Sequence, residues 1–69
     1  MISYNPLWKT LIDRNMNKGD LKDKVGISFG TLAKMGKNEP VNLKVIDAIC
    51  QELHCNVEDV LEIHHEGEL

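Results

Sequence analysis

Apolar residues recur along this chain at spacings of three and four positions, the pattern of helices that bury one side. The first such stripe consists of Leu7, Trp8, Leu11 and Ile12. Similar stripes follow in four further segments, separated by residues that begin or end helices. The pattern therefore predicts an all-α fold of five short helices, over about residues 5–15, 18–25, 28–36, 42–53 and 56–61.

Cap residues and helix breakers predict where these helices begin and end. Asn5 can cap free N–H groups, and Pro6 suits the first turn of a helix. Gly26 suits a left-handed backbone at the end of the second helix. Pro40 predicts a loop over residues 37–41, because it lacks an N–H group and disfavours helical geometry at the residue before it. Caps for the four later helices are expected at Asn17, Ser28, Asn42 and Asn56.

The length of 69 residues predicts one domain, with a core over residues 5–62 and an acidic tail over 63–69. Residues 1–4 are expected to be extended. A core of this size is small, which favours a protein that presents a surface over one that encloses a substrate. No apolar run is long enough to span a bilayer, and the first ten residues lack the pattern of a secretory signal. We therefore expect a cytoplasmic protein that does not bind membranes.

Charge is distributed unevenly along the chain. Residues 9–44 contain all eight basic side chains and four acidic ones, a net charge of +4. Residues 45–69 contain seven acidic side chains and no Lys or Arg, a net charge of −7, so the chain as a whole carries −3. Such a protein would approach a polyanion with its basic part only.

The most informative segment runs from Lys18 to Lys37 and reads KGDLKDKVGISFGTLAKMGK. Two short helices are joined here through Gly26, and a short connection containing glycine sets two helices at about 90–120°. Five apolar residues fall where the helices would face each other and the first helix: Leu21, Val25, Ile27, Leu32 and Met35. The outward positions of the third helix are mostly small, polar or basic.

This segment resembles the helix-turn-helix of the lambda-repressor-like regulators of the xenobiotic-response-element type, and most closely their compact, stand-alone bacterial members. The sequence words GIS, TLAKM and NEP carry the resemblance, which extends over about residues 5–62. It implies sequence-specific binding of double-stranded DNA by a transcriptional regulator, with a recognition helix over about 28–36 in the major groove. Three residues depart from the family: Lys22 replaces a small residue, Lys18 a frequent Gln, and Gly36 a common acidic residue.

The resemblance also implies two groups of DNA-contacting residues. The candidates for base contacts are Ser28, Phe29, Gly30, Thr31 and Lys34. The candidates for phosphate contacts are Lys18, Gly19, Lys37 and Asn38. Two of these assignments have an alternative. Phe29 could contact a thymine methyl group or fold back on the protein. Gly30 could allow a close approach to DNA or be a neutral glycine in a helix.

Other functions are less well supported by the sequence. Zinc-binding residue types occur at Cys50, His54, Cys55, His64 and His65, but their spacing does not match a zinc finger, and we expect reduced cysteines, no metal site and no cofactor. No arrangement typical of an enzyme is present. The main alternative is a protein-interaction module, such as an antitoxin or a partner-dependent regulator, that binds its partner through acidic residues 45–69. A homodimer is expected, with contacts through Ile2, Tyr4 and the last helix.

Overall fold

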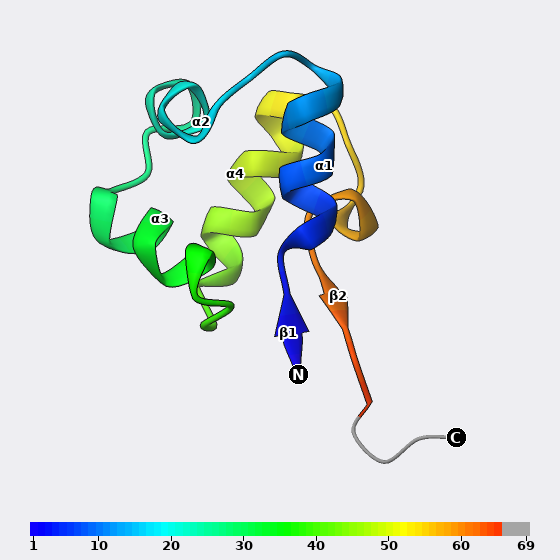
Figure 1. The fold of residues 1–69 in the computed structure, drawn as a ribbon. Coiled ribbons are helices and arrows are strands. Elements are labelled where there is room, and N and C mark those ends of the chain that lie inside the picture. The colour runs from blue at the N-terminus through cyan, green and yellow to red at the C-terminus, as the bar shows by residue number, and fades with distance from the viewer. Residues whose placement is uncertain (66–69) are drawn as a thin grey trace.

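The computed structural model describes residues 1–65, in which helices surround a shared core and the two ends of the chain pair as a short ribbon (Figure 1). The α-helices of this part of the chain are α1 (Asn5–Asp13), α2 (Lys18–Val25), α3 (Phe29–Gly36) and α4 (Leu43–Leu53). The remaining elements are a 3-10 helix, η1 (Val57–Asp59), and the strands β1 (Ile2–Ser3) and β2 (Glu62–Ile63). The first four predicted helices are thus confirmed, and so is the extended N-terminal segment.

The fifth predicted helix is wrong as an α-helix. Only one 3-10 turn forms, over Val57–Asp59. At its start, the Asp59 carboxylate accepts from the backbone N–H of Asn56 at 3.1 Å. The chain then leaves helical geometry, because β2 pairs antiparallel with β1 in the register Ile2↔Ile63 and Ser3↔Glu62. The predicted tail therefore begins inside this ribbon, and its residues 66–69 lie outside the described residues.

Helix α1 differs from its prediction at both ends. Asn5 is the first helical residue and not the cap; the capping position belongs to Tyr4, and the Ser3 hydroxyl accepts from the backbone N–H of Asn5 at 3.2 Å. Pro6 lies in the first turn as predicted. The helix ends at Asp13, earlier than expected, because Asn15 takes a left-handed backbone with φ 56° that no α-helix continues.

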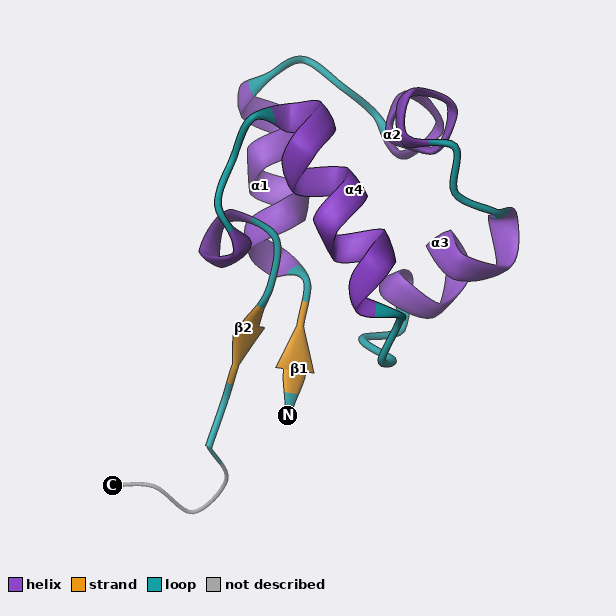
Figure 2. Ribbon diagram, turned by 180° about the vertical axis from the view of Figure 1, so that it is seen from behind, coloured by secondary structure: helices purple, strands orange, loops and turns teal. Residues whose placement is uncertain are grey.

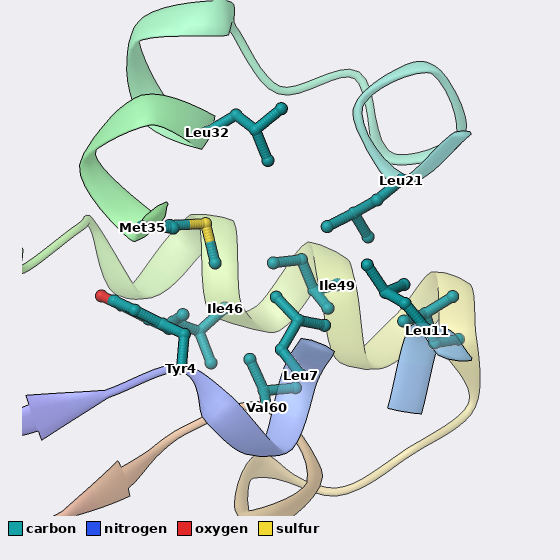
Figure 3. Packing of buried hydrophobic residues seen from close by; sticks show 10 residues of the cluster. Tyr4, Leu7, Leu11, Leu21, Leu32, Met35, Ile46, Ile49 and Val60 are labelled. Atoms are coloured by element: carbon teal, nitrogen blue, oxygen red, sulfur yellow. The ribbon is translucent and has the colours of Figure 1, made fainter. Parts of the chain in front are cut away.

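Ten buried apolar side chains from α1, α2, α3, α4 and the segments beside them form the core (Figure 3). They are Tyr4, Leu7, Leu11, Leu21, Leu32, Met35, Ile46, Ile49, Leu53 and Val60. Burying such a side chain is worth about 1.5–3 kcal/mol relative to leaving it in water. Ile12 was predicted on the inner stripe of α1, but it is 73% exposed, because that side of the helix turns away from the core.

Helices α2 and α3 lie to one side of the pair formed by α1 and α4 (Figure 2). α2 packs against both α3 and α4, whereas α1 packs against η1. The guanidinium of Arg14, just after α1, donates to the Leu53 carbonyl at the end of α4. This arrangement of the helices leaves the outer side of α3 open. A helix that enters a DNA groove needs such an open side.

Within residues 1–65, no helix has the length and apolar character required to cross a bilayer.

Candidate nucleic-acid interface

The turn between α2 and α3 has the predicted left-handed glycine and the predicted serine cap. Gly26 ends α2 with φ 81°, and its N–H donates to the Lys22 carbonyl at 2.8 Å. Ser28 then takes an extended backbone and caps α3. A side chain at Gly26 would meet no atom within 4 Å, so the left-handed backbone, and not lack of space, requires glycine here.

The third helix places two of its apolar residues, Leu32 and Met35, in the core. The five candidates for base contacts lie on its outer part: Ser28, Phe29, Gly30 and Lys34 are exposed, and Thr31 is half-buried. Four of the five candidates are therefore accessible to solvent. Their contacts with bases remain predictions.

The two hydroxyl groups on this surface are not equivalent. Ser28 Oγ accepts from the backbone N–H of Thr31 at 3.1 Å and donates to Thr31 Oγ1 at 3.0 Å. The proton of the Ser28 hydroxyl is thus used in its bond to Thr31 Oγ1, whereas Thr31 can still donate its own proton to an acceptor on a base. The sequence analysis assigned base contacts to both residues equally. It could not show which hydroxyl proton is used within the protein, because that depends on the side-chain geometry.

Phe29 is 75% exposed at the first position of α3. It does not fold back onto apolar surface, so that alternative is wrong. Its closest charged neighbour is Lys22, whose Nζ lies 5.4 Å from the centre of the ring. The ring remains accessible to a ligand.

The N-terminus of α2 carries the first group of phosphate candidates. Lys18 and Gly19 are exposed there, and their N–H groups precede the first hydrogen bond within the helix. The ammonium of Lys18 lies 4.4 Å from the centre of the Trp8 ring. The Asp20 carboxylate also lies at this end and accepts from the Asn17 N–H at 3.0 Å, so it opposes an incoming anion.

The second group, Lys37 and Asn38, directly follows α3. Lys37 is exposed, whereas Asn38 has a structural role that the sequence did not reveal. Asn38 takes a left-handed backbone with φ 58°, and its Oδ1 accepts from the Tyr4 N–H at 3.2 Å. The Tyr4 hydroxyl donates to the Glu39 carbonyl at 2.8 Å. Two bonds thus fix the loop after α3 to the start of α1, and only the amide NH₂ of Asn38 can serve a phosphate.

Comparison with known proteins gives the family of the domain. A profile described as the Cro/C1-type HTH DNA-binding domain matches residues 6–66. The chain belongs to this Cro/C1-type family. The crystal structure of transcriptional regulator VanUg (form II) superposes with a TM-score of 0.86 and 56% sequence identity, over 88% of this chain and 81% of that one. The uncharacterised HTH-type transcriptional regulator YozG of Bacillus subtilis (strain 168) is 37% identical over 54 residues, which are 75% of this chain and 64% of that relative.

Two departures from the Cro/C1-type pattern are related through Lys18. The position of Gly36, where the sequence resemblance implied an acidic residue, is open, because a Cβ there would meet only Lys18 Nζ, at 4.0 Å. An acidic side chain at this position would therefore lie next to the Lys18 ammonium. With glycine, Lys18 has no carboxylate within ion-pair distance among residues 1–65. The charge of Lys18 is thus left for another anion.

The third departure, Lys22, is partly buried on α2. Its side chain is 30% exposed, and its ammonium lies 3.7 Å from the Asp23 carboxylate as well as near the Phe29 ring. A lysine can bury its apolar stem and keep its charge at the surface, as expected. The helix-turn-helix of this Cro/C1-type domain therefore has a cation at the position where the sequence resemblance implied a small residue.

The zinc-type residues do not come together in the described part of the chain. Between residues 1 and 65, no three His, Cys, Asp or Glu side chains are grouped as a metal site requires. Cys50 and Cys55 are free thiols, and His64 pairs with Glu62 at 3.4 Å. Burial raises the pKa of the Cys55 thiol, and the neighbouring Cys50 and Asp59 raise it further. A raised pKa keeps this sulfur protonated at neutral pH and therefore a weak ligand.

Proposed function

We propose that this protein is a transcriptional regulator that binds double-stranded DNA sequence-specifically, with α3 in the major groove. One observation carries the proposal: α3 buries Leu32 and Met35 and leaves most of its other residues exposed on a helix-turn-helix of the Cro/C1 type. Both similar proteins described above are named transcriptional regulators, which supports the regulatory role. We infer no enzymatic activity and no cofactor, and we expect the protein to act in the compartment that holds the DNA.

Electrostatics favour this orientation. Helix α3 carries Lys34 and no acidic residue, and Lys18, Lys22 and Lys37 lie on the segments next to it. Among residues 45–65, the acidic side chains lie on other elements, which are α4, η1 and β2. A duplex carries about one negative charge per 1.7 Å of its axis, so it attracts the lysine-rich side and repels the acidic one.

Each candidate residue has a role that fits its chemistry. Lys34 would donate to O6 or N7 of guanine, and the Thr31 hydroxyl to a base acceptor. Phe29 would contact a thymine methyl group, and Gly30 would let the helix approach the bases closely. Phosphate contacts would come from Lys18, Gly19, Lys37 and the amide NH₂ of Asn38.

We further propose that the protein binds as a homodimer, because one recognition helix reads few base pairs and two-fold sites about 34–36 Å apart raise specificity. Tyr4 was predicted as a dimer contact, but it is only 1% exposed, which makes that assignment wrong for a folded chain. Ile2 is half-buried, and its ribbon partner Ile63 is 55% exposed. The ribbon therefore remains a candidate contact surface.

Selection of bound sequences from a random pool of duplex DNA, followed by a salt titration, tests the proposal. We expect a defined site and a log–log salt slope of about −0.9 for each phosphate neutralised. Lys34→Ala should change the selected sequence, whereas Lys18→Ala should weaken binding to all sequences alike. Absence of DNA binding at low salt, or binding that ignores salt, would overturn the proposal and favour a protein partner for residues 45–69.

A further inference from the structure

Lys22 lies within the helix-turn-helix at a position that no DNA-contact assignment uses. It is four residues after Lys18 on α2, a helix that packs against α3, and its side chain is only 30% exposed. Its ammonium lies 5.4 Å from the centre of the Phe29 ring, which belongs to the first residue of α3. A side chain of the supporting helix thus contacts a side chain of the recognition helix at its exposed end.

Phe29 needs such a contact to have a defined direction. The ring is 75% exposed, and an exposed side chain can exchange between staggered rotamers. A cation over the ring face favours the rotamer that keeps the ring beneath it, because the face of an aromatic ring is electronegative. Lys22 can fill this role because its own side chain is mostly buried, with only 30% of it exposed.

We propose that Lys22 is a positioning residue for base recognition: it holds the Phe29 ring where the ring contacts the 5-methyl group of a thymine. The inference rests on the proposed DNA-binding function and names the chemical group that this end of α3 recognises. Lys22 acts through Phe29, so its effect on recognition disappears when the ring is absent. The lysine that replaces a small residue here would then be a determinant of specificity and not a tolerated exception.

The probe is the duplex obtained by selection, compared with duplexes in which each thymine in turn is replaced by deoxyuridine, which lacks only the methyl group. For the wild-type protein, we expect one position at which this replacement weakens binding about fourfold, the value for burying one methyl-sized group. Phe29→Ala should lose this discrimination. Lys22→Met should reduce it by about twofold or more, the usual effect of an exposed cation–π contact, and Lys22→Arg should retain it.

Lys24→Met is the matched control, because Lys24 is an exposed lysine of the same helix with no ring contact in the structure. It removes the same charge and should leave the thymine-to-uracil ratio unchanged. In the Phe29→Ala background, Lys22→Met should not change the ratio further. Thermal melts establish that each variant is folded, and Lys22→Gln replaces the methionine variant if that one unfolds.

The outcomes separate the inference from the function on which it rests. If the wild-type protein selects no duplex, the proposed function fails. If it selects a duplex but binds the thymine and deoxyuridine forms equally at every position, only the inference is overturned. The same holds if Lys22→Met keeps the full thymine-to-uracil ratio that Phe29→Ala loses. A loss shared equally by Lys22→Met and Lys24→Met would also overturn it, because charge alone would then explain the effect.

Discussion

The molecule divides into two regions that achieve their structure differently. The platform, residues 2–14 and 43–63, supplies seven of the ten buried core side chains, whereas the helix pair, residues 18–36, supplies three. The three are Leu21, Leu32 and Met35. The helix pair depends instead on local backbone devices: the cap of Asn17, the left-handed Gly26 and the cap of Ser28. Stability therefore lies mainly in the platform, and the exposed surface that a ligand can use lies in the helix pair.

The largest effect is expected in the platform. Ile49 is fully buried in α4, so Ile49→Ala removes core contacts and leaves a cavity. We expect the free energy of unfolding to fall by about 2–5 kcal/mol, measured by urea denaturation. Leu43→Ala on the same helix is the control, because Leu43 is 78% exposed, and it should change stability by less than about 0.5 kcal/mol. Equal losses for the two variants would contradict the division into two regions.

A smaller effect is expected at the turn of the helix pair. Gly26→Ala forces a residue with a Cβ into φ 81° and should cost about 1–2 kcal/mol. Because nothing lies within 4 Å of the new Cβ, the cost comes from the backbone alone, and Gly26→Asn should lose less. Thermal unfolding of the wild-type protein and the two variants measures this order of stability. A neutral alanine variant would show that the turn does not depend on the left-handed backbone.

The link between the platform and the loop that follows the helix pair can be tested at Tyr4. Tyr4→Phe removes the hydrogen bond to the Glu39 carbonyl and should cost about 0.5–1.5 kcal/mol. Burial raises the pKa of the Tyr4 phenol, and a hydrogen bond with the Val41 backbone opposes that shift in part. The folded state therefore holds the phenolic proton to higher pH than the unfolded chain, so stability is lost as pH rises above about 10.

Chemical denaturation from neutral to alkaline pH measures both effects. The phenylalanine variant should lack the part of the alkaline loss that Tyr4 causes. If the wild-type protein and the variant lose stability in parallel above pH 10, Tyr4 is not the group responsible.

The smallest effect has the opposite sign. A Cβ at Gly30 would meet only Ser28 Oγ, at 3.9 Å, so the free protein has room for a side chain. Gly30→Ala should therefore stabilise α3 by about 0.5–1 kcal/mol. If the helix approaches DNA closely here, the same change should weaken DNA binding. A rise in stability without loss of affinity would show that Gly30 is a neutral glycine.

Local signals in the sequence were enough for most of the helices and for the turn. Asn17, Gly26, Ser28 and Asn42 each act within a few residues of their own position, so their roles can be recognised from sequence alone. The exposed surface of α3 followed from the same reasoning, because burial of Leu32 and Met35 determines which side faces outward.

Contacts between distant segments could not be recognised in this way. Asn38 has the sequence features of a loop residue, but its partner is Tyr4, and nothing near Asn38 in the chain indicates that. The ribbon that replaces the end of the fifth predicted helix could not be predicted either. Strand β2 pairs with β1, which lies near the other end of the chain. Lys22 was recognised as unusual, whereas its contact with Phe29 required the packing of α2 on α3.

The pairing of Ile2 with Ile63 gives this small protein one contact that encloses nearly the whole chain. Closing so long a loop has a large entropic cost, whereas the helical turns form among near neighbours. The ribbon is therefore expected to assemble after the helices during folding. It is also expected to open before them in brief excursions from the native state, since two short strands alone are barely stable. Tyr4 directly follows β1, so each such opening would loosen the loop that follows α3.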